Sequence, residues 1–257
     1  MRTLQNALLS AGEPWPEPIE IVNENGQSNI VLLCEHASNF IPKAYAGLGL
    51  SDADLARHIA WDLGAAKLTR ALAHTLDAPA FLGTYSRLLI DLNRPPHVES
   101  SSALISEDTE IPGNRDLDDQ ERQRRIATIF DPFHARVAFH MKAKLDQAQP
   151  VRLVSIHSFT KVFRGEVRPW HAGVLFDQTH AAAFCDHVLK RLAANPSINV
   201  GANVPYQVSR DDDYALYVHG GDLGVAAILI EVRQDLLEDE RGITEWTHRL
   251  IDAVGAP

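Results

Sequence analysis

The sequence predicts an α/β protein, with a single-domain, three-layer α/β/α fold and a mainly parallel mixed sheet. Short apolar runs such as 30–34 have the composition of strands buried on both faces, as in a parallel sheet covered by helices. These runs alternate with longer segments of helical spacing, which favours a doubly wound order. No repeat or obvious linker divides the 257 residues, so we expect one domain over 1–257.

Local signals place the first elements. Residues 1–28 contain three prolines and little periodicity, so we expect an N-terminal extension that packs on the surface before the first core strand. Ser51 and Asp54 form a weak capping box, and apolar residues at helical spacing follow, so the sequence predicts a helix that continues to about residue 76. A second strand is expected over 87–92. Two consecutive prolines, Pro95 and Pro96, should prevent it from continuing.

The same alternation continues in the second half of the chain. Residues 96–114 are rich in Ser, Glu, Asp and Pro and are expected to form a long loop. A long charged helix is expected over 116–147, with a possible break near Asp131-Pro132. The remaining predicted elements are strands over 151–156, 172–176 and 225–230 and helices over 179–195 and 239–254.

Composition narrows the classes of partner and the compartment. The chain has 34 acidic and 24 basic side chains and a net charge of −10, which argues against non-specific binding to nucleic acid or anionic membranes. Cys34 and Cys185 have no CxxC spacing and are expected to be buried thiols in a reducing compartment. There is no signal-peptide pattern and no apolar run of about eighteen residues. The sequence therefore predicts a cytoplasmic protein, and it does not indicate an oligomeric state.

Polar side chains follow four of the predicted buried strands. They are His36, Asn93-Arg94, His157-Ser158, and Glu231 with Arg233. In open α/β sheets, ligands bind where strands end at their carboxyl edge. Two imidazoles and a carboxylate can hold zinc and leave a position for water, and a further carboxylate can take the proton of that water. Arginine can bind a substrate carboxylate or a developing oxyanion, so these residue types predict metal-assisted amide hydrolysis.

Several short motifs resemble those of known hydrolases. Three segments resemble signature segments of the zinc carboxypeptidases: Ile90-Asp91-Leu92-Asn93-Arg94, Ser155-Ile156-His157-Ser158-Phe159 and Ile230-Glu231-Val232-Arg233. Together with Glu35-His36-Ala37-Ser38, Tyr85-Ser86-Arg87 and Pro95, they resemble more closely the N-formylglutamate amidohydrolase family, over most of residues 30–235. The resemblance implies a phosphorylase/hydrolase-like α/β fold and one zinc ion as cofactor. It also implies a small anionic N-acyl amino acid as substrate, N-formyl-L-glutamate first.

The resemblance also implies roles for individual residues. His36 and His157 match the metal-ligand histidines of the family, and Glu231 matches the general base of the carboxypeptidases. Asn93 and Arg94 match a pair that grips a substrate carboxylate. Two further neighbours, Ser158 and Arg233, are expected to help bind the substrate.

The third metal ligand is open between two acids. Carboxypeptidases have a glutamate three positions after the first histidine, where this chain has Asn39. Asp62 matches the aspartate of the amidohydrolases and is the preferred ligand, with Glu35 as the alternative. Adjacent residues on an extended strand point to opposite faces, which counts against Glu35 beside His36. His58 lies one helical turn before Asp62 and is expected to be its hydrogen-bond partner or a bystander.

Arg87 has two readings. It is expected to stabilise the oxyanion, but a structural salt bridge to Asp91 or to helix carboxylates is an equally good interpretation. On a regular strand Arg87 and Arg94 would face opposite sides, so a joint site requires the strand to end or bulge before Arg94.

Departures from the family pattern keep other functions open. Glu35 and Ser38 stand where the amidohydrolases usually have Pro and Gly. A carboxypeptidase-like peptidase would use the same residues. A non-catalytic small-molecule-binding protein that has lost the metal is the third hypothesis, and metal analysis distinguishes it from both enzymes.

Overall fold

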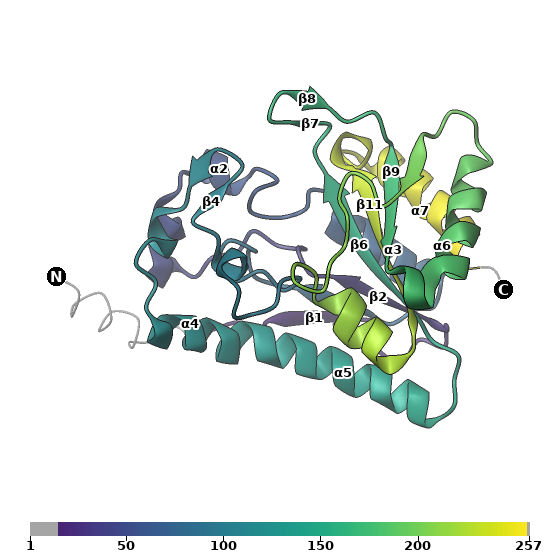
Figure 1. Ribbon diagram of the computed structural model, residues 1–257, viewed down its shortest axis with the longest axis horizontal. Helices are drawn as coiled ribbons and strands as arrows, with labels where there is room; N and C mark the ends of the chain where they lie inside the picture. Colours follow the sequence, from purple (N-terminus) through teal and green to yellow (C-terminus); the bar gives the residue numbers. More distant parts are fainter. Residues whose placement is uncertain (1–14, 256–257) are drawn as a thin grey trace.

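One seven-stranded mixed sheet organises the protein, and the computed structural model describes residues 15–255 of it (Figure 1). The strands of this sheet are β1 (Ile19–Val22), β2 (Ile30–Cys34), β3 (Ala80–Gly83), β6 (Arg152–Phe159), β9 (Ala172–Phe176), β10 (Val200–Ala202) and β11 (Ala226–Arg233). They lie side by side in the order β1-β3-β2-β6-β11-β9-β10. Four consecutive strands, β3, β2, β6 and β11, are parallel, whereas β1 and β9 pair antiparallel with their inner neighbours and β10 is parallel to β9.

Strand β2 shows why an unbroken apolar run lies at the centre of this sheet. Successive side chains of a strand point to opposite faces. Val31 and Leu33 therefore pack into one hydrophobic core, and Leu32 and Cys34 pack into the other. Because both faces are covered, no position of β2 meets water and all five residues are buried.

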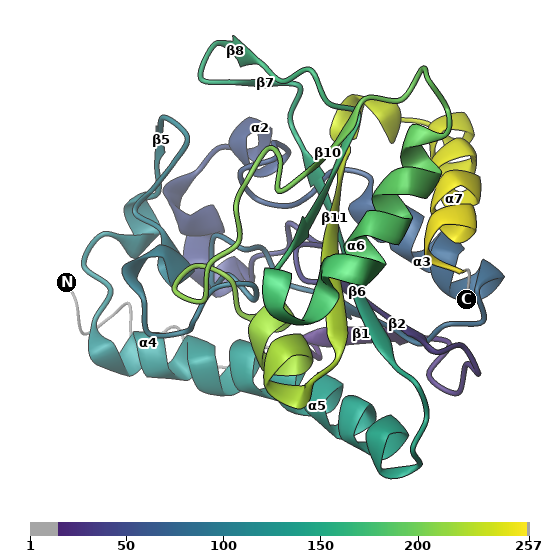
Figure 2. The ribbon, with the colours of Figure 1, turned by 45° about the vertical axis from the view of Figure 1, so that its right-hand side comes forward.

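Helices form the two outer layers (Figures 1 and 2). One face of the sheet is covered by α3 (Ala65–Thr75), α6 (Gln178–Ala193) and α7 (Glu240–Val254), which pack against one another and against the sheet. The other face is covered by α5 (Asp131–Asp146), which continues from α4 (Asp119–Arg125), and by the π-helical turn Leu216–Gly220. This arrangement confirms the predicted α/β/α class with a mainly parallel mixed sheet.

The predicted strand over 87–92 is wrong. The strand in this part of the chain is β3, and residues 87–92 form turns. The apolar side chains are buried as expected, but the carbonyls of Leu88 and Leu89 accept hydrogen bonds from side chains instead of from a neighbouring strand. Their donors are Asn114 Nδ2 at 2.8 Å for Leu88, and Arg125 Nη1 at 2.8 Å and Ser102 Oγ at 3.0 Å for Leu89.

The predicted helix from Ser51 to about residue 76 is two helices. Ser51 does cap the first, α2 (Asp52–Leu55), by accepting a hydrogen bond from the backbone of Asp54. The chain then leaves the helix and re-enters it as α3. Gly64 makes the re-entry possible, because its φ of +81° suits glycine and a Cβ there would lie 2.4 Å from the Cβ of Leu237.

The long helix is continuous where a break was considered possible. A π-helical segment, Ile126–Phe130, joins α4 to α5, and Pro132 lies in the first turn of α5, where its missing N–H is tolerated. The strand predicted at 172–176 is confirmed as β9. Strands β6 and β11 extend beyond their predicted ends, so His157 and Glu231 lie within strands.

Some elements have no counterpart in the sequence prediction. Strand β1 lies within the expected surface extension over 1–28, of which residues 1–14 fall outside the described part, and β10 forms the opposite edge. The long loop contains the small hairpin of β4 (Ile105–Ser106) and β5 (Thr109–Glu110). A second hairpin pairs β7 (Val162–Phe163) with β8 (Glu166–Val167). Every helix within residues 15–255 is too short or too polar to cross a membrane.

Candidate metal centre

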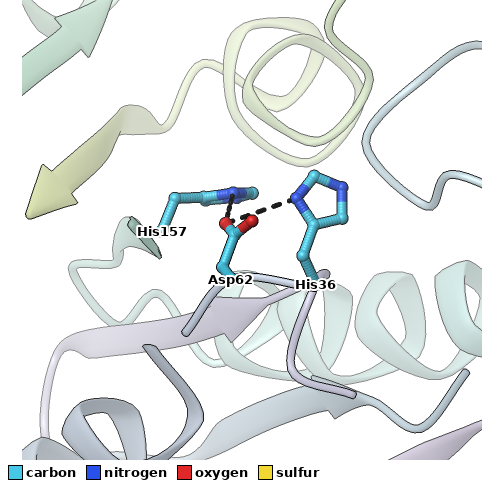
Figure 3. A group of neighbouring side chains, drawn as sticks. All are labelled: His36, Asp62 and His157. Atoms are coloured by element: carbon cyan, nitrogen blue, oxygen red, sulfur yellow. Dashed lines mark hydrogen bonds and ion pairs between the residues drawn. The ribbon is translucent and has the colours of Figure 1, made fainter. Parts of the chain in front are cut away.

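Three buried side chains from distant segments meet at the carboxyl end of the parallel strands (Figure 3). His36 follows β2, Asp62 lies in the bend between α2 and α3, and His157 lies in β6. One ligand atom of each lies within 4.8 Å of the others. Asp62 Oδ2 is 2.8 Å from His157 Nδ1 and 3.4 Å from His36 Nδ1. The carboxylate oxygen thus stands between two imidazole nitrogens.

The backbone fixes this arrangement. The Asp62 amide donates to the His36 carbonyl at 2.9 Å, which ties the bend after α2 to the end of β2. The Ser158 amide donates to Asp62 Oδ2 at 3.3 Å. The non-helical stretch that ends at Gly64 therefore positions the Asp62 carboxylate, and a continuous helix through this region would not.

The outer ring nitrogen of each histidine contacts a second carboxylate. His36 Nε2 lies 2.7 Å from Asp91 Oδ1, and His157 Nε2 lies 3.0 Å from Glu35 Oε2. Ser155 Oγ donates to the same Glu35 oxygen at 2.5 Å. A carboxylate that accepts from Nε2–H directs the lone pair of a neutral imidazole to Nδ1, the arrangement found around metal-bound histidines. Glu35 therefore lies behind His157, and Asp62 faces the point between the two Nδ1 atoms.

The ionisable groups of the cluster shift the pKa values of one another. Burial would raise the pKa of Asp62, but the neighbouring His36 and His157 lower it. Burial likewise opposes ionisation of Glu35, yet the contacts with His157 and Ser155 lower its pKa to about 2. The two carboxylates raise the pKa of His157 well above its usual value, against the effect of burial. Several carboxylates thus surround two imidazoles in a buried space.

The donor atoms fit a zinc ion. Two imidazole nitrogens and one carboxylate oxygen are a common donor set of catalytic zinc sites. His36 Nδ1 is buried and has no hydrogen-bond partner among residues 15–255, so it is a polar atom that a metal ion would satisfy. The outer carboxylates supply the supporting contacts that such ligands need.

A cavity of about 510 Å³ opens beside the cluster. The carboxylate of Glu231 lines it, next to His157 in the register of β11 and β6. Glu231 Oε2 is buried and has no hydrogen-bond partner within the described part of the chain. Burial raises the pKa of Glu231 to about 7. A free carboxylate with this pKa can accept a proton and return it near neutral pH.

Arg87 lines the cavity and also forms the salt bridge that was considered as its alternative role. Its Nη2 donates to Asp91 Oδ2 at 2.7 Å, and its Nη1 is 3.7 Å from Asp62 Oδ1. Because residues 87–92 are not a strand, the alternation expected between Arg87 and Arg94 does not apply, and both side chains line the cavity.

The residues expected to bind substrate are not equally placed. Arg94 lines the cavity and pairs with Asp212. Asn93 also lines it, but its Oδ1 accepts from the Ala215 amide at 3.3 Å and its Nδ2 donates to Asp213 at 3.3 Å. Asn93 thus also holds a neighbouring loop.

The two further residues expected near the substrate differ in the same way. Ser158 lines the cavity and donates its hydroxyl to the Leu63 carbonyl at 2.8 Å. Arg233 is not among the described residues that line the cavity. Its guanidinium is held at the end of β11 by Asp235 at 2.7 Å and by the Trp170 carbonyl at 3.2 Å. His58 lines the cavity 3.4 Å from Glu107, and it is not the hydrogen-bond partner of Asp62.

Sequence reasoning missed four acids that line the cavity: Asp91, Glu107, Asp212 and Asp213. Asp91 was considered only as a partner of Arg87, although it also contacts His36. Asp212 and Asp213 line the cavity from a loop that precedes the π-helical turn. The requirement of a metal-bound histidine for a carboxylate behind it could have drawn attention to Asp91. No pattern in the sequence indicated the loop acids.

The chain is similar to several known proteins. The family model of N-formylglutamate amidohydrolase matches residues 28–238. A crystal structure of a gene product from Agrobacterium tumefaciens is 34% identical, with a TM-score of 0.89 over 93% of this chain and 94% of that one. N-formylglutamate amidohydrolase from Ralstonia eutropha is 17% identical, with a TM-score of 0.68 over 93% of this chain and 96% of that one, and shows the same fold. A search of curated sequences gives no significant match. The matched segment includes all three residues of the cluster, and the chain belongs to the N-formylglutamate amidohydrolase family.

Proposed function

We propose that the protein is a zinc-dependent amidohydrolase that cleaves N-formyl-L-glutamate to L-glutamate and formate. The observation that carries the proposal is the convergence of His36, Asp62 and His157 beside a cavity that also contains the free carboxylate of Glu231. A volume of about 510 Å³ suits a small-molecule substrate. Family membership supports the reaction class.

Different residues would carry out different steps of the proposed hydrolysis. When bound, zinc would lower the pKa of a water molecule to about 7 and polarise the carbonyl of the scissile amide. Glu231 would accept the proton of the attacking water and deliver it to the leaving amino group. Arg94 would hold a carboxylate of the glutamate part, through a guanidinium that can donate two parallel hydrogen bonds. Arg87, whose Nη1 lies 3.7 Å from Asp62 Oδ1, would stabilise the negative charge that develops on the amide oxygen.

We also propose a cytoplasmic location. Cys34 and Cys185 are buried and form no disulfide within the described chain, which supports a reducing, cytoplasmic location.

Formate release from N-formyl-L-glutamate by the purified full chain tests the proposal. We expect about one zinc ion per chain, formate release by the zinc-loaded protein, loss of release after chelation, and recovery when zinc is restored. His36→Ala should abolish both zinc binding and turnover. His58→Ala is the matched control, because His58 lines the same cavity outside the three-residue cluster, and it should keep its zinc.

Three other results would contradict the proposal in different ways. Formate release that persists in fully chelated protein would exclude the metal mechanism. A protein that removes C-terminal residues from N-formyl peptides faster than it releases formate would be a carboxypeptidase-like peptidase. A protein that binds N-formyl-L-glutamate with no stoichiometric zinc and no turnover would be the metal-free binding protein considered from the sequence.

A further inference from the structure

The guanidinium of Arg94 is held by an acid of the same chain at the edge of the cavity. Arg94 Nη1 donates to the backbone carbonyl of Asp212 at 2.8 Å and lies 3.1 Å from Asp212 Oδ1. Both residues line the same cavity as the histidine cluster. A substrate carboxylate that approaches Arg94 therefore meets a position where a carboxylate already stands.

The loop that carries Asp212 is anchored by the residues on either side of it. Asp213 accepts from Asn93 Nδ2 at 3.3 Å and from the Ser209 amide at 3.0 Å. The Tyr214 amide donates to the Asn93 carbonyl at 3.1 Å. These contacts are independent of the side chain of Asp212, so its carboxylate can move while the loop stays in place.

The side chain of Asp212 is lightly held. Its relative exposure is 61%, and apart from Arg94 its carboxylate contacts the hydroxyl of Ser209 at 3.1 Å. Ion pairs this exposed contribute little stability, because water solvates both partners and the side chains lose entropy. Breaking the pair costs little, whereas the carbonyl of Asp212 can keep its hydrogen bond to Arg94.

We propose that Asp212 is a specificity-determining residue of the acyl-amino-acid site, an internal counter-ion of Arg94 that a substrate carboxylate displaces. This inference rests on the proposed function for the identity of the substrate. An acidic ligand must spend part of its binding free energy on breaking the pair between Arg94 and Asp212. The affinity for the substrate and for the product glutamate is lowered alike. A ligand with an uncharged group at this position displaces nothing and gains nothing from Arg94. Asp212 thus shortens occupancy of the site by the acidic product to the same degree as it weakens substrate binding.

The variant Asp212→Asn tests this in the zinc-loaded full chain, because it removes the charge and keeps the size of the side chain. KM for N-formyl-L-glutamate and the inhibition constant of L-glutamate should both fall by about two- to five-fold, the range expected for removal of an exposed competing charge. KM for the substrate analogue amidated at the carboxylate that Arg94 binds should not change. Asp211→Asn is the matched control, because Asp211 is exposed, carries the same charge and is outside the described cavity lining.

A second variant and a binding measurement complete the test. In an Arg94→Ala background, Asp212→Asn should have no effect on either constant, because no pair remains to be broken. Calorimetric titration with glutarate, a dicarboxylate with no amide to cleave, should show the same two- to five-fold tighter binding to Asp212→Asn. This measurement separates the two proposals, since glutarate binding responds to Asp212 even if N-formyl-L-glutamate is not hydrolysed.

Three outcomes would overturn the role of Asp212. Equal effects of Asp211→Asn and Asp212→Asn would mean that only the overall charge of the loop matters. A rise in KM and in the glutarate dissociation constant in Asp212→Asn would mean that Asp212 supports the binding site. An effect of Asp212→Asn that persists without Arg94 would exclude the counter-ion mechanism.

Discussion

His36 Nε2 lies 2.7 Å from Asp91 Oδ1, and the opposite nitrogen of the same ring faces the Asp62 carboxylate. Asp91 also accepts a hydrogen bond from Arg87 at 2.7 Å. One carboxylate therefore orients a candidate metal ligand and holds an arginine of the cavity. The first prediction follows from this double contact.

Asp91→Asn should weaken zinc binding by about 10- to 100-fold, the usual effect of losing the carboxylate behind a metal-bound histidine. The amide can still accept from His36, but it no longer adds negative charge or holds Arg87 as tightly. Competition with a chromophoric chelator measures the affinity. Ser100 lines the cavity and is not part of the three-residue cluster, so Ser100→Ala is a control that should keep the wild-type affinity. Unchanged zinc affinity in Asp91→Asn would mean that the carboxylate only pairs with Arg87.

Glu231→Gln should lower turnover by about 10²- to 10⁴-fold, because it removes the base and keeps the shape of the side chain. Zinc content and thermal stability should stay close to wild type, since Glu231 is outside the three-residue cluster and its Oε2 has no hydrogen-bond partner among residues 15–255. A purely structural role beside Arg233 would predict lower stability with nearly normal turnover of the folded fraction. The guanidinium of Arg233 contacts Asp235 and Trp170, which argues against that role.

Arg94→Lys should reduce kcat/KM for N-formyl-L-glutamate by at least about tenfold, because an ammonium cannot reproduce the two parallel hydrogen bonds of a guanidinium. Wild-type protein should prefer N-formyl-L-glutamate to its amidated analogue, and the variant should show much less preference. Zinc content should not change. Equal losses for both substrates would assign Arg94 to the fold or to the oxyanion.

The buried pair His134 and His219 predicts how stability depends on pH. His134 Nε2 is 2.8 Å from the Leu92 carbonyl, which can only accept, so His134 donates there and its Nδ1 accepts from His219 Nε2 at 2.9 Å. Burial lowers the pKa of His134 to about 3 and that of His219 to about 4. Between these values and the unfolded pKa of about 6.5, the unfolded chain binds protons that the folded chain does not. Stability should therefore fall as pH drops from about 7 to about 4, by an amount on the order of 3 kcal/mol for each of the two histidines.

Chemical unfolding of the metal-free protein between pH 4 and pH 8 checks this. The double variant His134→Gln/His219→Gln should lose less stability over that range than wild type does. His180→Gln, at an exposed position, should follow the wild-type curve. Parallel curves for wild type and the double variant would show that the pair does not cause the acid sensitivity.

The sequence predicted correctly the buried apolar runs whose backbone is hydrogen-bonded to neighbouring strands. Strand β9 has its predicted bounds, and β2 reads as a buried strand because both of its faces meet helices. The apolar residues of 87–92 are also buried, but the carbonyls of Leu88 and Leu89 are satisfied by Asn114 and Arg125, which are remote in sequence. Hydrophobicity reports burial and not the source of hydrogen bonds, so this error could not be avoided from the run itself.

Some residues of the site could be predicted from the sequence and others could not. Short motifs indicated His36, Asp62 and His157, which lie together, and Glu231, which lies beside them. The same motifs also suggested Arg233, but Asp235, two residues later, holds its side chain elsewhere. Asp212 and Asp213 reach the cavity only because Asn93 fixes their loop, and a contact between segments 120 residues apart leaves no local pattern.

The bend that carries Asp62 has a consequence for assembly of the molecule. His157 contacts Asp62 across 95 positions of the chain, so no short fragment contains both partners. The unfolded polypeptide would present isolated donors with little affinity for the ion. Zinc would then bind after the fold has formed, and it would not nucleate folding. Its free concentration would set the free energy of unfolding of the finished molecule, since a ligand that binds only the folded form stabilises it by mass action.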